Sequence, residues 1–197
     1  MSILLLAGSP SERSRSAALL DAAGLRLRRR GATVERLLIR DLSPQALLLA
    51  DVAHRTIAAA VDQVARATAL VVATPVYQAA YSGVLKLFLD LLPQSALRNK
   101  AVLPLATGGS AHHMLALDYA LRPVLQSLAA RHVLPGIYAI DAQVTLTPEG
   151  AHCIGDEIAL RLDEAVDRLV AEDMRATPPR AAGAFEPIAF ARVRCSV

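Results

Sequence analysis

The sequence contains no tryptophan, few other aromatic residues and only two cysteines. Because aromatic residues make up only 4% of the chain, it offers no platform on which nucleic-acid bases could stack. Cys153 and Cys195 form no CxxC pair, and His112 and His113 have no companion ligands at metal-site spacing. These absences predict a reduced, metal-free, cytoplasmic protein that binds no nucleic acid.

Long apolar runs and a strong excess of one charge are also missing. No apolar stretch approaches the ~18 residues that span a bilayer. Residues 1–7 lack the basic start of a signal peptide and are too short for one. The 21 Lys and Arg residues exceed the 18 Asp and Glu residues only slightly, which gives a net charge of +3. We therefore expect no membrane partner, and the small positive charge suits small anionic ligands.

Continuous apolar runs alternate with stretches of helical periodicity. Such runs are typical of parallel strands that are covered on both faces. The predicted strands lie near residues 2–7, 33–39, 69–74, 100–106 and 134–140, and the predicted helices near 17–30, 56–68, 83–92, 114–131 and 149–173. This alternation predicts an α/β fold: a doubly wound, five-stranded parallel sheet with helices on both faces.

Two regions fall outside the alternation. Residues 40–55 form a longer connection that contains Ser43-Pro44, which predicts a loop with a short helical turn. Pro178 and Pro179 end the last predicted helix, so we expect one domain over residues 1–174 and a tail over 175–197. The tail keeps apolar residues, which favours docking on the body or on a neighbouring subunit, with a disordered end as the alternative.

The segment Gly8–Ser16 directly follows the first predicted strand and opens a helix. Ser9, Ser14 and Ser16 offer hydroxyls, Arg15 offers a fork of N–H donors, and a helix N-terminus adds backbone amides. The segment is neither a Walker A sequence nor a GxGxxG fingerprint, which disfavours ATP or a dinucleotide bound in Rossmann fashion. It predicts a phosphate site, with simple capping of the first helix by Ser14 or Ser16 as the alternative.

A second loop, residues 74–83, directly follows the third predicted strand. Pro75 is expected to end that strand, since the residue before a proline is pushed out of helical geometry. Pro75, Val76 and Tyr77 then offer a flat, partly apolar seat and backbone donors, which suit an isoalloxazine ring. Both loops leave the carboxyl end of the sheet, where ligands bind in open α/β folds.

The second loop resembles the NAD(P)H-dependent FMN reductases, which are flavodoxin-like enzymes. The residues that carry the resemblance are Pro75, Tyr77, Ser82, Gly83, Leu85, Lys86 and Asp90. Further matching segments lie at residues 7–10, 73–77, 89–93, 105–112 and 117–125. The chain is most similar to the branch that serves two-component alkanesulfonate monooxygenases, and the resemblance runs from about residue 1 to about residue 170.

The resemblance implies a set of cofactor-binding residues in three loops. The FMN phosphate is expected at Ser9, Ser14, Arg15 and Ser16, and the ring at Pro75, Val76 and Tyr77. The pyrimidine side of the ring is expected along Thr107, Gly108, Gly109 and Ser110. The glycines make physical sense there because they let backbone N–H groups approach the ring without a Cβ atom in the way. A simple turn after the fourth strand is the alternative.

The pair Tyr119 and Pro123 lies inside the fourth predicted helix. Proline at 123 cannot donate to the carbonyl of residue 119, and its ring clashes there, so the helix must kink or widen. We expect Tyr119 to lie in a π-bulge at a subunit contact near the flavin edge. A plain proline kink in a monomer is the alternative.

The predicted function is transfer of a hydride from nicotinamide C4 of NADPH or NADH to flavin N5, with reduced FMN supplied to a partner monooxygenase. The cofactors carry this chemistry, so no catalytic side chain is expected. The resemblance implies a homodimer or homotetramer. Three alternatives remain: an FMN-retaining reductase of quinones, azo dyes or metal oxyanions, a flavodoxin-type electron carrier, and a phosphate-binding module without redox activity.

Overall fold

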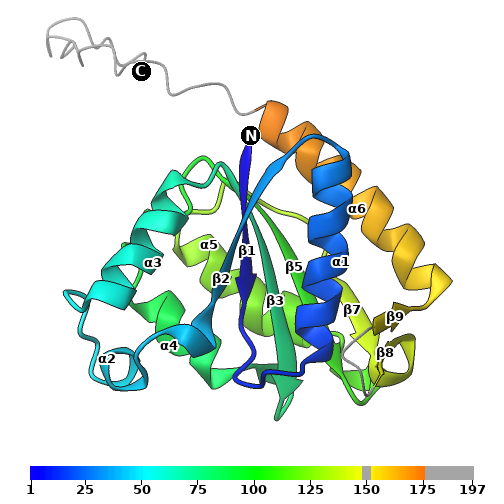
Figure 1. Cartoon of the computed structure of the whole chain (residues 1–197), viewed down its shortest axis with the longest axis horizontal. Coiled ribbons are helices and arrows are strands. Elements are labelled where there is room, and N and C mark those ends of the chain that lie inside the picture. The colour runs from blue at the N-terminus through cyan, green and yellow to red at the C-terminus, as the bar shows by residue number, and fades with distance from the viewer. Residues whose placement is uncertain (148–151, 176–197) are drawn as a thin grey trace, which may run out of the picture.

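A mostly parallel sheet forms the centre of the protein in the computed structural model, which describes residues 1–147 and 152–175 (Figure 1). The parallel strands are, in spatial order, β2 (Thr33–Leu38), β1 (Ser2–Ala7), β3 (Ala69–Tyr77), β5 (Ala101–Gly108) and an outer strand in two pieces, β6 (His132–Val133) and β7 (Ile137–Ile140). A short strand, β4 (Ala80–Tyr81), pairs antiparallel with the end of β3. When the parallel strands are counted in chain order and β6 and β7 are counted as one strand, their spatial order is 2-1-3-4-5. This is the order of flavodoxin-like sheets, which confirms the predicted fold class.

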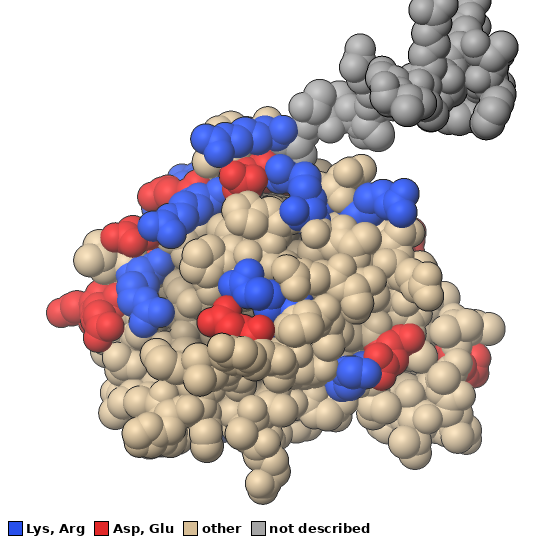
Figure 2. Space-filling view, turned by 180° about the vertical axis from the view of Figure 1, so that it is seen from behind, with Lys and Arg blue, Asp and Glu red and all other residues tan. Residues whose placement is uncertain are grey.

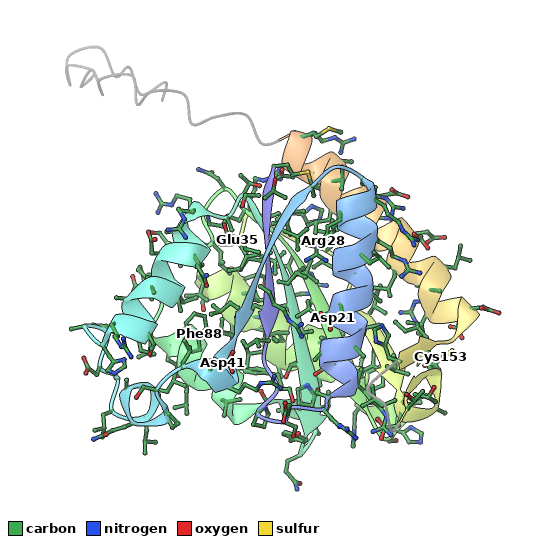
Figure 3. The ribbon with its side chains drawn as sticks, in the orientation of Figure 1. Asp21, Arg28, Glu35, Asp41, Phe88 and Cys153 are labelled. Carbon is green, nitrogen blue, oxygen red and sulfur yellow. The ribbon has the colours of Figure 1, made fainter. Side chains whose placement is uncertain are left out.

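Helices cover both faces of the sheet. One face carries α1 (Arg15–Arg29) and α6 (Asp156–Met174), and the other carries α3 (Arg55–Arg66), α4 (Gly83–Asp90) and α5 (Arg122–Ser127). The strands are apolar throughout because alternate residues serve the two layers: Ile3 and Leu5 pack toward α1 and α6, and Leu4 and Leu6 pack toward the opposite helices. Phe88 of α4 is fully buried in the second layer (Figure 3).

The outer strand differs from the continuous strand expected at 134–140. It breaks between Val133 and Ile137, where Pro135 has no N–H group to donate to a ladder. The break lies beside Pro104 of β5, which also lacks an N–H group. Two prolines at the same level therefore remove the donors that an unbroken ladder would need.

The last helix begins later than the prediction of residue 149, which is wrong at this end. Residues His152–Ile154 form β9, which pairs with β8 (Val144–Leu146) in a separate antiparallel hairpin. Gly155 is the N-cap of α6, and Asp156 and Glu157 occupy its first turn, where negative charge suits the helix dipole. Residues 148–151 lie outside the described residues.

The predicted helix over 114–131 is also divided. A π-helix runs from Ala116 to Leu121, α5 follows and ends at Ser127, and Ala129 has a φ of 63°. That left-handed residue turns the chain back toward β6 before residue 131. The connection over 40–55 contains the expected helical turn, α2 (Pro44–Leu48), after a 3₁₀ turn at Ile39–Asp41.

Charged side chains are unevenly distributed on the face opposite to that of Figure 1. Figure 2 shows them gathered in alternating sign over the upper part of this face, whereas the lower part carries few. Along α6, Arg161 pairs with Glu157 and Arg168 with Glu164. Within the described residues, no helix is long and apolar enough to cross a membrane. The predicted tail over 175–197 lies outside the described residues except for Arg175.

Candidate active site

The carboxyl end of the sheet lies at the lower edge of Figure 1, and three loops there line one open cleft. They follow β1, β3 and β5, and the strand order reverses between β1 and β3, which is where open α/β sheets bind ligands. The cleft has a volume of about 190 Å³ and is lined by Ser9, Ser11, Arg13, Ser14, Arg15, Pro75, Val76, Tyr77, Thr107, Gly108, Gly109 and Asp141. The structure thus brings together all the predicted binding residues except Ser16 and Ser110.

The loop that follows β1, residues 8–14, is here called the phosphate loop. It is anchored at its start, where the Gly8 amide donates to the Ala73 carbonyl oxygen at 2.7 Å. A Cβ atom on residue 8 would lie 3.0 Å from that oxygen and from the Leu85 side chain. The close approach of β3 and α4 therefore requires glycine at this position.

Ser14 is the N-cap of α1 by position, but its hydroxyl accepts no bond from a helix amide. It lies 2.8 Å from the hydroxyl of Ser16, which is buried beneath the loop and does not line the cleft. The amides of the first turn of a helix have no partner within the helix. The capping interpretation thus explains Ser14 poorly, and these amides add donors to the side of the cleft on which Ser14 lies.

Arg15 begins α1 and reaches across to the chain that follows β7. Its Nη1 atom lies 3.3 Å from Oδ2 of Asp141, and its Nε donates to the Val144 carbonyl oxygen at 3.1 Å. The sequence prediction missed Asp141, as well as Ser11 and Arg13 of the phosphate loop. Ser11 and Arg13 lie inside the predicted loop, and Asp141 directly follows a predicted strand at the same edge of the sheet, so position gave a usable signal for all three.

The loop that follows β3, residues 74–82, is here called the ring loop. The expectation that Pro75 ends the strand is wrong, because β3 continues to Tyr77. Pro75 pairs in register with Thr107 of β5, and Val76 and Tyr77 pair with β4. Gln78 and Ala79 connect the two strands with φ values of 47° and 60°, the backbone of a two-residue type I′ hairpin.

Two buried hydroxyls hold the base of the ring loop, and that of Ser82 also joins it to the phosphate loop. The Thr74 hydroxyl accepts from the Ser82 amide at 3.0 Å and donates to the Pro75 carbonyl oxygen at 2.9 Å. The Ser82 hydroxyl donates to the Gly8 carbonyl oxygen and accepts from the Leu85 amide, so it also caps α4. Thr74 is 0% exposed and Ser82 is 1% exposed, which makes these bonds hard to replace with water.

The loop that follows β5, residues 107–110, is here called the glycine loop. A Cβ atom on Gly108 would collide with the Tyr138 hydroxyl, which donates to the Ser110 carbonyl oxygen at 2.6 Å. Burial, and secondarily the charge of Asp141, raise the pKa of Tyr138, so its phenol keeps its proton. Ser110 is not among the residues that line the cleft, and its hydroxyl accepts from the His112 amide and caps the 3₁₀ turn Ala111–His113.

The π-helix Ala116–Leu121 contains Tyr119, and Pro123 lies in the first turn of α5 directly after it. Tyr119 is 79% exposed, and Met114 and Leu115 just before the π-helix are each 54% exposed. The π-helix packs against β4 of the ring loop. A widened, apolar and exposed helical segment therefore flanks the cleft.

The sequence and the fold both match known flavin enzymes. The family model described as NADPH-dependent FMN reductase matches residues 1–145. An FMN reductase (NADPH) of Escherichia coli K12 is 47% identical over 144 residues, which cover 73% of this chain and 75% of that protein. An FMN reductase (NADPH) of Pseudomonas putida is 49% identical over 144 residues, which cover 73% of this chain and 73% of that protein.

The solved structures give the same picture. The apo form of an NADH:FMN oxidoreductase (EMOB) superposes with a TM-score of 0.77 at 42% identity, covering 85% of this chain and 87% of that one. A flavodoxin of Streptococcus pneumonia TIGR4 shares the fold, with a TM-score of 0.60 at 15% identity, covering 87% of this chain and 98% of that one. The chain belongs to the NADPH-dependent FMN reductase family, and it is a flavodoxin-like enzyme that uses FMN together with NADPH or NADH.

Proposed function

We propose that FMN binds in the cleft with its phosphate at the phosphate loop and its ring between the ring loop and the glycine loop. The observation that carries this proposal is the convergence of three loops, each from a different strand, on a single cleft. Ser9, Ser14 and the first amides of α1 offer donors to a phosphate, and Arg15 adds a positive charge beside them.

The other side of the cleft fits a flat ring. Pro75, Val76 and Tyr77 form a wall that the β3–β4 pairing holds in place. Apart from its chain neighbours, the nearest atom of the described residues to a Cβ atom on Gly109 would be Oδ2 of Asp141, at 4.0 Å. Packing within the chain therefore does not require glycine here, whereas close approach of a ligand to the backbone does.

FMN, when bound, accepts a hydride from the nicotinamide of NADPH or NADH. The task of the chain is to hold the flavin and to leave room for the second ring against it. Tyr77 lies at the mouth of the cleft with 49% of its surface exposed. The wall formed by Pro75, Val76 and Tyr77 therefore borders an open mouth through which the nicotinamide can approach.

Reduced FMN is then released to a partner monooxygenase of the two-component type that acts on alkanesulfonates. The openness of the cleft supports an exchangeable flavin, and the resemblance of the ring-loop motif to the reductases of such systems supports the partner. Relatives named NADPH-dependent and NADH-dependent FMN reductases both match the chain, the latter including one named SfnE of Pseudomonas putida at 38% identity over 103 residues.

The decisive measurement is oxidation of NADPH and NADH at 340 nm by flavin-stripped protein, with and without added FMN, in air. Turnover that depends on FMN and saturates at micromolar flavin supports the proposal. Flavin that stays bound through purification and does not exchange favours the FMN-retaining reductase instead. Flavin binding without any nicotinamide oxidation overturns the reductase and favours an electron carrier.

A homodimer or homotetramer in which Tyr119 contacts a second copy near the flavin edge also belongs to the proposal. The exposed apolar side chains of Met114, Leu115 and Tyr119 support it, because such a group beside a site is typical of an interface. Sedimentation velocity of wild-type protein, Tyr119→Ser and Pro123→Ala tests it. Unchanged mass and unchanged flavin release in both variants would refute the contact.

A further inference from the structure

We propose that Asp141 sets the affinity of the cleft for phosphate-bearing flavins by holding Arg15 in an internal ion pair. The inference rests on the proposed position of the FMN phosphate beside Arg15. It assigns a role in substrate affinity to a residue that belongs to no motif and that lies far from the phosphate loop in sequence.

The geometry shows that Arg15 is engaged within the protein. Its Nη1 is 3.3 Å from Oδ2 of Asp141, and its Nε donates to the Val144 carbonyl oxygen at 3.1 Å. Arg15 starts α1, whereas Asp141 starts the 3₁₀ turn that follows β7. The pair therefore joins opposite sides of the cleft, and both residues line it.

The pair remains accessible to a ligand. The Arg15 side chain is 42% exposed and the Asp141 side chain is 46% exposed. A phosphate that enters the cleft must share the guanidinium with the carboxylate or displace it. In both cases, the negative charge of Asp141 stays close to the phosphate dianion and raises the free energy of the bound state.

Within residues 1–147 and 152–175, Arg15 is the one cation that pairs with the carboxylate. Tyr138 keeps its proton, because burial and then Asp141 itself raise its pKa. The nearest glycine-loop position, Gly109, carries no side chain. Asp141 therefore weakens binding of a flavin that carries a phosphate and leaves a flavin without one almost unaffected. Such a difference keeps FMN exchangeable, as a released product requires.

The test compares dissociation constants of FMN and riboflavin, measured by titration calorimetry on flavin-stripped protein. Asp141→Asn keeps the size of the side chain and removes its charge. We expect this variant to bind FMN about tenfold more tightly. The estimate is the Coulomb energy between the single charge of the carboxylate and the two charges of the phosphate at roughly 6 Å in water. Riboflavin, which lacks the phosphate, should bind with unchanged affinity.

Three further variants separate the ion pair from general charge effects. Asp62→Asn makes the same change of net charge on α3, where Asp62 pairs with Arg66 outside the cleft, and should leave both affinities unchanged. Arg15→Gln should weaken FMN binding. In the double variant with Asp141→Asn, the gain that comes from direct repulsion between Asp141 and the phosphate should remain, and only the part that comes from freeing Arg15 should be lost. Rising ionic strength should also reduce the gain, since the pair is partly exposed.

Several outcomes would overturn the inference. Unchanged or weaker FMN binding in Asp141→Asn would show that the carboxylate positions Arg15 for the phosphate rather than competing with it. Equal gains for FMN and riboflavin would place its effect on the ring. Wild-type protein that binds neither flavin would overturn the proposed function and the inference together, whereas the first two outcomes leave that function intact.

Discussion

The phosphate loop and the ring loop border the same cleft but are held in different ways. The ring loop is a paired hairpin whose base is fixed by the buried hydroxyls of Thr74 and Ser82. The phosphate loop is anchored at Gly8 and at the start of α1, while serine hydroxyls and an arginine between these points line the cleft. Backbone pairing thus shapes one wall, and side chains supply the donors on the other.

This difference separates stability from binding. Changes at the base of the ring loop should lower the free energy of unfolding, because they break buried hydrogen bonds. A change at the cleft-lining hydroxyl of Ser14 should leave that free energy almost unchanged and weaken FMN binding. The variants that follow test this separation.

Ser82→Ala should have the largest effect on stability. It removes the cap of α4 and leaves the buried Gly8 carbonyl oxygen without this donor. We expect a loss of about 3 kcal/mol in the free energy of unfolding, measured by urea denaturation. Ser127→Ala is the matched control, since the exposed Ser127 hydroxyl donates to the Val124 carbonyl oxygen within α5. Equal losses in both variants would contradict the importance of the Ser82 bonds.

Gly108→Ala should cost about 2 kcal/mol, because the new methyl group collides with the Tyr138 hydroxyl. The double variant Gly108→Ala/Tyr138→Phe removes that hydroxyl and should recover part of the loss. The measurement is the urea midpoint of the single and double variants against Tyr138→Phe alone. If the loss in the double variant equals the sum of the losses in the two single variants, the Tyr138 hydroxyl is not the cause of the effect of Gly108→Ala.

Ser14→Ala should act on binding alone. The Ser14 hydroxyl contacts only Ser16 within the described part of the chain and caps no helix amide. We expect FMN to bind about tenfold more weakly, as for the loss of one hydrogen bond to a charged phosphate, with a melting temperature within about 1 °C of wild type. A clear loss of stability would revive the capping interpretation.

Ala79→Gly should have the smallest effect and the opposite sign. Ala79 has a φ of 60°, which glycine adopts without the cost that alanine pays. Part of this gain is offset by the greater freedom of glycine in the unfolded chain, so we expect a stabilisation of roughly 0.5 kcal/mol. Ala59→Gly, on the exposed side of α3, should instead destabilise by about 1 kcal/mol. Destabilisation by Ala79→Gly would contradict the hairpin geometry.

The sequence was sufficient to predict the parallel sheet and the position of the cleft. Continuous apolar runs identify strands that are covered on both faces, and ligand loops follow such strands at a known edge. It was not sufficient for β8 and β9, because three-residue strands give too short a pattern to distinguish from a helix start. The Arg15–Asp141 pair was missed because no local pattern links two residues that only the fold brings together.

The broken outer strand also disfavours the addition of a further strand at this edge of the sheet. An intact outer strand offers a row of free amides and carbonyls to which another chain can add. Here Pro135 supplies no amide, and the Arg122 guanidinium donates to the carbonyl oxygens of Val133 and Leu134, at 2.7 and 3.2 Å. A partially unfolded neighbour therefore meets no continuous row of free amides and carbonyls at this edge. The break therefore disfavours strand addition at this edge and leaves helices and loops as the surfaces through which copies can associate there.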